Sequence, residues 1–329
     1  MKRMLSLIAA ACLVLSLAAC GAPQSQQQTQ SQESGGTQDG TDTAASAPQG
    51  TYTLTDDLGR SVSVTGSERV AALLGSYADM WLLAGGSVCA SVDDAWEDFG
   101  LTLPEETVNL GSLNKPNLEA LLGARPELVF ASSKLSGHRD LMEALEGAGI
   151  AVIYLDASDF ESYLRVLKLM TDITGHSELY ERYGSAQKER IDAMLEAHSD
   201  DGEQSVLVMR ASAASIRAKN SEDTMLGGML RDFGCVNIAD SDSMLLDNLS
   251  VESIIEKNPD RIFIIQTGDS IDAVKSAVEA MFAENPLWNE LDAVKNGKVH
   301  YMDKRLYNQK PNARFAEAYE GLERILYEK

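Results

Sequence analysis

Asn117-Leu-Glu-Ala-Leu-Leu-Gly-Ala-Arg-Pro-Glu-Leu-Val-Phe130 has a second copy, Ser250-Val-Glu-Ser-Ile-Ile-Glu-Lys-Asn-Pro-Asp-Arg-Ile-Phe263. Each copy opens with a helix-capping residue, places apolar residues at helical spacing, and then reaches a Pro that ends the helix. The β-branched or aromatic run after the Pro is typical of a buried strand. Helix–Pro–strand is the closing half of a crossover onto a parallel sheet. The two copies therefore predict two related α/β lobes, with chance similarity of two ordinary α/β units as the alternative.

Strand and helix patterns alternate around both copies. A β-hairpin is expected over residues 52–64, where apolar and polar residues alternate on either side of Asp56-Asp57-Leu58-Gly59-Arg60. The other expected strands are 69–74, 88–92, 128–131, 150–155, 205–209, 236–238, 262–265 and 297–302. The helices expected outside the two copies are 77–84, 140–148, 160–173, 222–233, 271–282 and 311–327. This alternation predicts an α/β fold with central parallel sheets.

A long helical stretch separates the two copies. From Ser177 to about Ala197 the chain has no Pro and one Gly. Its apolar residues form one helical stripe, made of Leu179, Tyr180, Tyr183, Ala186, Ile191, Met194 and Leu195. Such a helix spans about 30 Å, enough to join two lobes, although a surface helix of one lobe fits the pattern too. We expect an N-terminal α/β lobe at residues 51–175, a single inter-lobe helix at 176–200 and a C-terminal α/β lobe at 201–329.

The N-terminus has the pattern of an export signal. Lys2 and Arg3 precede the apolar run Leu5–Leu17, which is shorter than the ~20 residues that a membrane span needs. Leu17-Ala-Ala-Cys-Gly21 resembles the lipobox of bacterial lipoproteins, which implies a signal peptide at residues 1–19 and a lipid on Cys20. Residues 20–50 are polar and contain no aromatic residue, as in a disordered tether. We expect a lipid-anchored protein on the extracytoplasmic face of the cell membrane.

Charge and cysteine content narrow the function. The chain has 28 basic and 50 acidic residues, which argues against nucleic acid as a partner. Outside the signal peptide and Cys20, the only cysteines are Cys89 and Cys235, which the repeat assigns to different lobes. We expect two free, mostly buried thiols; an inter-lobe disulfide is the alternative that an exported compartment permits.

Further motifs resemble one transport family. They are Thr55-Asp-Asp-Leu-Gly-Arg60, Pro116-Asn-Leu-Glu119, Pro126-Glu-Leu-Val129, Pro259-Asp-Arg-Ile262, Asn285-Pro-Leu-Trp288 and Ala293-Val-Lys-Asn-Gly-Lys-Val299. In order and spacing they resemble the substrate-binding proteins of ABC importers for iron–siderophore complexes, haem and cobalamin, the class III periplasmic binding proteins. The resemblance covers residues 51–329. It implies two α/β lobes joined by one long helix, a ligand cleft between them, little motion on binding, and no chemistry on the ligand.

The same resemblance implies a partner. Family members dock on an ABC permease dimer, which works with an ATPase, through one acidic residue near the tip of each lobe. These residues carry over to Glu119 and Glu252. The alternative role of each is electrostatic, because an acid in the first turn of a helix favourably opposes the helix dipole. We expect a monomer in complex with such an importer.

Ligands of open α/β sheets lie outside the carboxyl ends of the strands. Applied to both lobes, this rule selects six candidate ligand-binding residues: Tyr77, Trp96, Lys134, Arg210, Lys219 and Tyr307. Basic residues at the cleft of an acidic protein predict an anionic ligand, and the aromatic residues are candidates for stacking. For each basic residue the alternative is a solvated surface charge, and for each aromatic residue it is ordinary packing.

A ferric siderophore is the favoured ligand, followed by haem and then cobalamin. Haem would need an axial ligand, for which Tyr77, Tyr307 and His138 are available. No resident cofactor or directly bound metal is expected, because the four His residues are not paired at ligand spacing. The sequence also lacks the nucleophile elbow, zinc, phosphate-loop and dinucleotide motifs of common enzymes. An extracellular sensor domain with the same fold remains as an alternative.

Overall fold

The computed structural model describes residues 51–268 and 270–328. These described residues all belong to one compact unit, Ser46–Lys329. The predicted signal peptide, the lipid site at Cys20 and the tether lie outside the described residues. Among those residues, no helix combines the length and the apolar character that crossing a bilayer requires.

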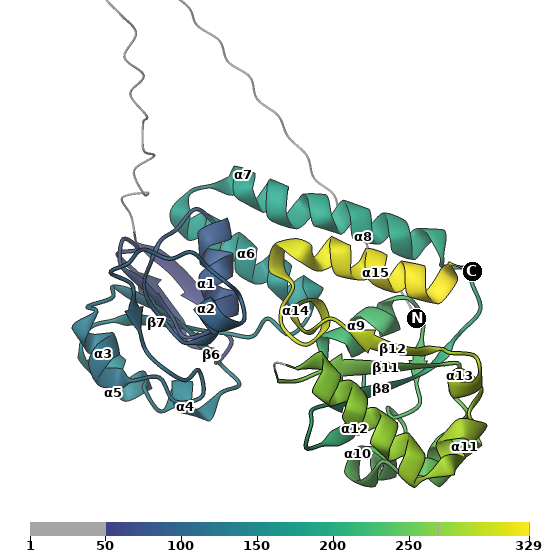
Figure 1. The fold of residues 1–329 in the computed structure, drawn as a ribbon. Coiled ribbons are helices and arrows are strands. Elements are labelled where there is room, and N and C mark those ends of the chain that lie inside the picture. The colour runs from purple at the N-terminus through teal and green to yellow at the C-terminus, as the bar shows by residue number, and fades with distance from the viewer. Residues whose placement is uncertain (1–50, 269, 329) are drawn as a thin grey trace, which may run out of the picture. The chain divides into compact units, whose positions relative to one another are not determined.

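The first lobe is built on a parallel sheet with the strand order β5-β4-β3-β6-β7 (Figure 1). Its strands are β3 Val70–Ala72, β4 Val88–Ser91, β5 Val108–Asn109, β6 Leu128–Ser132 and β7 Ala151–Leu155. Its helices are α1 Gly75–Leu83, α2 Asp94–Glu97, α3 Leu118–Gly123, α4 Ser136–Arg139, α5 Met142–Gly147 and α6 Phe160–Thr174. The expected hairpin is present as β1 Tyr52–Thr55 paired with β2 Ser61–Val64. Its turn is held by Asp56, which accepts hydrogen bonds from the backbone N–H groups of Leu58 and Arg60.

The second lobe is built on a sheet with the order β10-β8-β11-β12, to which β9 adds an antiparallel strand beside β8. Its strands are β8 Ser205–Ala211, β9 Ile216–Lys219, β10 Val236–Asn237, β11 Arg261–Gln266 and β12 Val299–Met302. Its α-helices are α9 Met225–Asp232, α10 Ser243–Asn248, α11 Val251–Lys257, α12 Ile271–Glu284, α13 Asp292–Lys295, α14 Lys304–Tyr307 and α15 Phe315–Tyr327. The 3₁₀ turns Pro286–Glu290 and Asn312–Arg314 complete it. The expected α/β class with central parallel sheets is confirmed.

Several boundaries differ from the sequence prediction, and two of the differences have a local reason. The helix expected from residue 222 begins at Met225, because the Thr224 side chain caps it by accepting from Gly227 N at 3.0 Å. The last helix was expected from residue 311, but its first turn is the 3₁₀ segment Asn312–Arg314. Strand β9 was not expected from the sequence.

Both copies of the repeated stretch fold alike. Asn117 caps α3 by accepting from Ala120 N at 3.0 Å, and Ser250 caps α11 by accepting from Ser253 N at 3.4 Å. The residue before the Pro is left-handed in both copies, with φ of 50° at Arg125 and 41° at Asn258. This shared conformation turns the chain from the helix into the strand.

The long stretch between the copies is helical but not uniform. It consists of α7 Ser177–Tyr180, a π-helical turn at Glu181–Ser185 and α8 Ala186–Ala197. The Tyr183 carbonyl accepts from the Tyr163 hydroxyl at 2.8 Å and from Gln187 Nε2 at 2.5 Å. The wider π-helical turn rotates the following residues about the helix axis. As a result Gln187 is buried and Ala186 is exposed. The predicted stripe was therefore wrong at Ala186.

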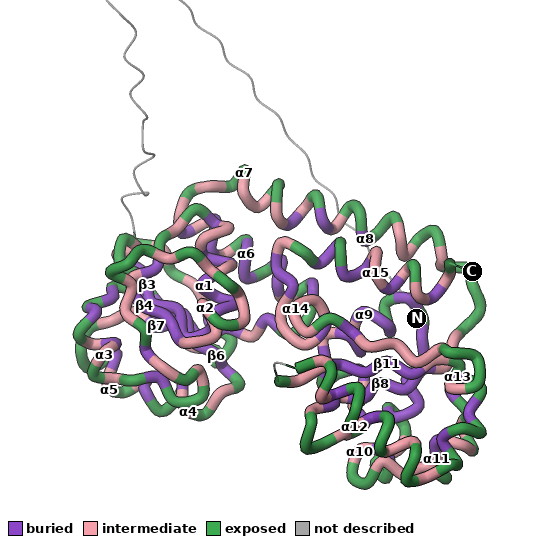
Figure 2. Tube along the Cα trace, viewed as in Figure 1, coloured by how far each residue is buried: buried purple, intermediate pink, exposed green. Residues whose placement is uncertain are grey.

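The largest hydrophobic core contains residues of both lobes (Figure 2). Phe160 of α6 and Phe315 of α15 have ring centroids 5.0 Å apart, and Tyr163 lies 5.1 Å from Phe315. Both predicted thiols are free, with Cys235 buried and Cys89 half-buried, so the inter-lobe disulfide is excluded.

Candidate ligand-binding site

A pocket of about 260 Å³ lies where segments of both lobes meet. Its lining residues are Glu97, Asp98, Gln266, Gly268, Asp303, Lys304, Arg305 and Gln309. The first two come from α2 and the residue after it, and the others lie beyond the carboxyl ends of β11 and β12. This is the edge at which open α/β sheets bind ligands.

Helix α2 is held in place by a close approach to α1. A Cβ atom on Gly75 would lie 2.8 Å from the Ala95 backbone, so the helix start requires Gly at that point. The Asp94 carboxylate accepts from Gly75 N at 2.8 Å. Burial raises the pKa of Asp94 to about 6, and the neighbouring Asp98 contributes to the rise. The first lobe therefore presents a crowded acidic edge to the pocket.

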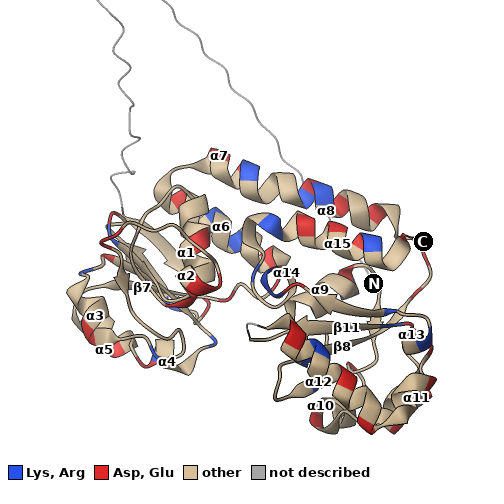
Figure 3. Cartoon of the chain, in the orientation of Figure 1, with Lys and Arg blue, Asp and Glu red and all other residues tan. Residues whose placement is uncertain are grey.

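Helix α14 brings two cations to that edge (Figure 3). Lys304 Nζ lies 2.7 Å from Asp98 Oδ1, and an Arg305 guanidinium nitrogen lies 3.3 Å from Asp79 Oδ2. The Arg305 guanidinium also stacks 4.1 Å from the ring centroid of Phe99. The two cations are thus paired with acids of the first lobe.

Asn312, in the 3₁₀ turn that follows α14, connects the second lobe to α1. Its side-chain nitrogen donates to Ser76 O at 3.0 Å and to Asp79 Oδ2 at 2.8 Å. Its backbone carbonyl accepts from Gln187 Nε2 of α8 at 3.1 Å. Burial raises the pKa of Asp79, while the hydrogen bond from Asn312 and the charge of Arg305 oppose the rise. One buried residue therefore connects the first lobe, the second lobe and the helix between them.

None of the six predicted ligand-binding residues lines this pocket. Trp96 lies immediately before the lining residue Glu97 and is half-buried. Lys134 is exposed and pairs with Asp156 at 3.1 Å, in the first lobe. The lining acids and amides Glu97, Asp98, Asp303 and Gln309 were not among the six predicted residues.

Arg210 and Lys219 lie at a different part of the same sheet edge. Arg210 of β8 stands directly opposite Arg217 of β9, so their side chains share one face of the sheet, together with Lys219 two residues further on. Among the described residues none of the three has a carboxylate partner in an ion pair, and the buried Nε of Arg210 has no hydrogen-bond partner. Burial lowers the pKa of Arg210, while the charge of Asp223 opposes this.

Three candidates for stacking or haem ligation, Tyr77, Tyr307 and His138, are buried and form hydrogen bonds within the protein. Tyr77 is 1 % exposed and donates to Leu155 O at 2.7 Å, while Tyr307 is 4 % exposed and donates to Ala318 O at 2.9 Å. His138 is fully buried; its Nδ1 accepts from Ser132 N at 2.9 Å and its Nε2 lies 2.7 Å from Leu113 O. All three side chains therefore stabilise the core. The sequence placed them at the cleft because it shows that they lie near strand ends but not in which direction their side chains point.

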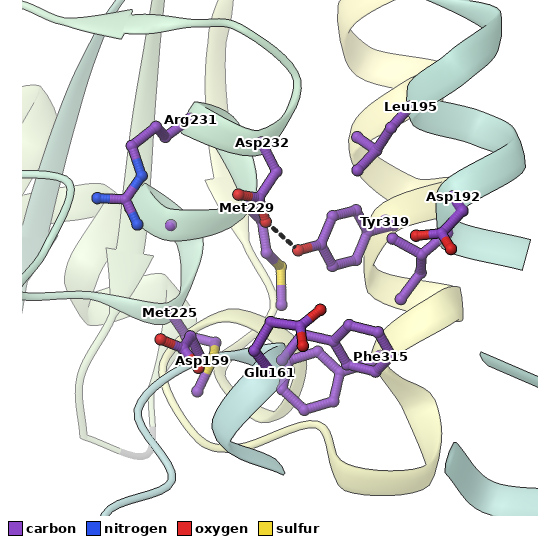
Figure 4. Close-up of a pocket in the computed structure, with 13 residues that line it drawn as sticks. Asp159, Glu161, Asp192, Leu195, Met225, Met229, Arg231, Asp232, Phe315 and Tyr319 are labelled. Atoms are coloured by element: carbon purple, nitrogen blue, oxygen red, sulfur yellow. Dashed lines mark hydrogen bonds between the residues drawn. The ribbon is translucent and has the colours of Figure 1, made fainter. Parts of the chain in front are cut away.

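A second pocket of about 310 Å³ lies among α6, α8, α9 and α15 (Figure 4). Its charged lining is mostly acidic: Asp159, Glu161, Asp192 and Asp232 against Arg231. The Tyr319 hydroxyl donates to Asp232, which ties α15 to α9. The acidic lining would repel an anion. In the described part of the chain, no group of three or more His, Cys, Asp or Glu side chains is placed to hold a metal ion.

Glu119 and Glu252 occupy matching places. Each is exposed in the first turn of its helix, α3 or α11. The structure thus shows both carboxylates available to solvent, next to helix N-termini, as either a docking role or a dipole role requires.

The fold and the cleft agree with one family. The model of the family described as periplasmic binding protein matches residues 70–306, and the chain belongs to that family. Among its relatives is the Fe(3+)-citrate-binding protein YfmC of Bacillus subtilis, 25 % identical over 76 % of this chain and 77 % of the relative. Another is the vitamin B12-binding protein of Pectobacterium carotovorum, 24 % identical over 64 % of this chain and 75 % of the relative. These relatives are named as binding proteins and not as enzymes.

Solved structures show the same fold. An ABC transporter substrate-binding protein from Listeria monocytogenes superposes with a TM-score of 0.66 at 21 % identity, over 80 % of this chain and all of the other. The expected membership of the periplasmic binding proteins is confirmed.

Proposed function

We propose that the protein is the extracytoplasmic substrate-binding component of an ABC importer, and that it captures an iron chelate, with a ferric siderophore favoured. Family membership over residues 70–306 and the relative named for ferric citrate support this. The observation that carries it is the polar cleft edge of the second lobe, which runs from Arg210 and Arg217 across Gln266 to Lys304.

An acidic chelate fits the unpaired cations of this edge. Arg210, Arg217 and Lys219 share one sheet face and have no carboxylate partner within the described ranges. A guanidinium offers a planar fork of donors that matches carboxylate geometry. We propose Arg210 and Lys219 as ligand contacts of the second lobe, and Trp96 and Lys134 as ligand contacts of the first. We do not propose Tyr77 or Tyr307, whose rings are buried.

Cobalamin is the second candidate. A relative is named for vitamin B12, and the pocket between the lobes is lined by three acids, Glu97, Asp98 and Asp303, against the two cations Lys304 and Arg305, which favours a ligand without a large negative charge. Haem is disfavoured, because the hydroxyls of Tyr77 and Tyr307 and both ring nitrogens of His138 already have partners. None of the described residues that line the pocket is a Tyr, His, Cys or Met.

The remaining parts of the proposal concern the partner and the membrane. We propose that Glu119 and Glu252 dock on the permease, that the lipid on Cys20 anchors the protein, and that it acts as a monomer. The equivalent, exposed positions of the two Glu residues support the docking role.

A thermal-shift panel tests the ligand. We expect ferric citrate or another ferric siderophore, at 100 times its dissociation constant, to add about 2.7 kcal/mol of stability and raise the melting temperature by several degrees. Cyanocobalamin and haemin are the comparison ligands. Arg210→Gln should lose most of the shift, whereas Arg182→Gln, a change on the inter-lobe helix, should keep it. A shift with haemin alone would contradict the proposal, and the absence of any shift would favour a sensor domain.

A further inference from the structure

In the pocket between the lobes, a carboxylate of the protein itself pairs with a lysine. Asp98 Oδ1 lies 2.7 Å from Lys304 Nζ, and both residues line the pocket. At about 260 Å³ the pocket is smaller than the roughly 300–1,000 Å³ of sites that enclose drug-sized ligands. An acidic group that reaches the Lys304 ammonium in this pocket has to compete with Asp98.

We propose that Asp98 is an internal competitor: its carboxylate occupies Lys304 until an acidic group of the ligand takes its place. This inference rests on the proposed function, and it assigns Lys304 as a carboxylate-binding residue and Asp98 as a residue that sets ligand selectivity. The protein's own carboxylate shows what chemistry the ammonium accepts at this position. The ligand class is a chelate that presents at least one free carboxylate to the second lobe.

The neighbouring pair cannot exchange in the same way. Asp79 also accepts from the buried Asn312, and Arg305 also donates to Lys310 O and stacks on Phe99. Those extra contacts would be lost if Arg305 moved to a ligand. The Asp98 carboxylate, in contrast, has Lys304 as its one ion-pair partner among the described residues.

Competition predicts a selective effect of ligand charge. When an acid binds Lys304, the displaced Asp98 carboxylate remains nearby, and its repulsion weakens binding of the acid. Removal of that charge should strengthen binding of anionic chelates and leave neutral ligands nearly unchanged. Asp98→Asn keeps the shape of the side chain, and the backbone N–H of residue 98 still donates to Asp94 O.

The first test measures affinities by isothermal titration calorimetry. We expect Asp98→Asn to bind ferric citrate about two- to fivefold more tightly than the wild-type protein, in line with the strength of exposed ion pairs. Glu97→Gln is the matched control, since it removes the same charge from the same pocket, and Glu97 forms no ion pair with a described residue. Its effect should be less than half as large. Cyanocobalamin, the neutral probe, should show no gain with either variant.

The second test needs no ligand. Acylation of lysines by a hydroxysuccinimide ester, read out by peptide mass spectrometry, should label Lys304 several-fold faster in Asp98→Asn than in the wild-type protein or Glu97→Gln. Equal labelling in all three proteins would overturn the pairing itself.

The outcomes separate the inference from the proposed function. If the wild-type protein binds ferric citrate but Asp98→Asn and Glu97→Gln change its affinity equally, the competitor role is overturned and the proposed function stands. If none of the proteins binds ferric citrate or another ferric carboxylate chelate, the competitor role is overturned whatever the labelling shows, and the proposed function stands only if another ferric siderophore gives a thermal shift.

Discussion

The two lobes have similar local structure at their tips but contribute opposite charges at the cleft. At the tips, α3 and α11 share a capping residue, an exposed Glu in the first turn and a left-handed residue before Pro. At the cleft, the first lobe contributes acids, with Asp79 and Asp98 in contact with the second lobe, whereas the second lobe contributes Lys304 and Arg305.

This difference separates two tasks. Features that both lobes share can act in the same way on the two halves of a symmetric partner, as a permease dimer would offer. Features of opposite charge act between the lobes, where they hold the cleft edges together and where a ligand has to compete with them. A change at the tips should therefore spare ligand binding, and a change at the cleft should not.

Charge reversal at both tips gives the largest expected effect. Glu119→Lys combined with Glu252→Lys should abolish uptake of the ligand by cells, because two cations would replace the acids proposed to dock on the permease. Affinity for the ligand should stay unchanged, since both residues are exposed and away from the pocket. Uptake of radioactive iron and calorimetry of the purified variant measure the two quantities.

The control for this pair is the reversal of two other exposed acids in helices, Glu143→Lys with Glu279→Lys. It changes the net charge by the same amount and should leave uptake intact. Normal uptake by the Glu119/Glu252 variant would remove the docking role and leave the helix-dipole role. Equal losses in both variants would show that net charge, and not these positions, matters.

The acidic edge of the first lobe should reduce stability near neutral pH. The pKa of Asp94 is raised to about 6 in the folded protein, from 3.8, chiefly by burial. The folded state therefore binds more protons than the unfolded state between about pH 4 and 6, and stability falls as the pH rises through that range. Asp94→Asn removes the charge and keeps an oxygen for Gly75 N.

We expect Asp94→Asn to match the wild-type protein at pH 4 and to exceed it by about 1–2 kcal/mol at pH 7. Urea unfolding at a series of pH values measures this difference. Asp93→Asn removes a neighbouring charge that also raises the pKa of Asp94, so it should change the pH dependence in the same direction but by less. A difference between Asp94→Asn and the wild-type protein that is constant with pH would contradict the raised pKa of Asp94.

The contrast also explains what the sequence could predict. The tips follow from local rules, because a cap, apolar spacing and Pro act within a dozen residues. The cleft pairs do not, since Asp98 and Lys304 are 206 positions apart and only the folded chain brings them together. The rule for strand ends selected Tyr77 and Tyr307, but it could not tell that their side chains turn into the core.

The helix between the lobes shows a second limit. Its extent was predictable from the absence of Pro, but the facing of Ala186 was not. A π-helical turn has no simple sequence signature, and this one depends on the Tyr163 hydroxyl from α6 reaching the Tyr183 carbonyl. Tertiary contacts thus override the regular 3.6-residue period.

The caps test how alike the two tips are, and their expected effects are the smallest. Asn117→Ala should lower the free energy of unfolding by about 1 kcal/mol, and Ser250→Ala by somewhat less, as for other capping residues. The order follows from the distances, since Asn117 accepts at 3.0 Å and Ser250 at 3.4 Å. Asn114→Ala is the control, because the Asn114 side chain forms no hydrogen bond with a described residue, and it should change little. A larger loss for Ser250→Ala would contradict this order and show that α11 depends more on its cap than the shared sequence pattern implies. The physical reason would be that the Ser250 hydroxyl also donates to Glu252, whose charge opposes the helix dipole in the same first turn.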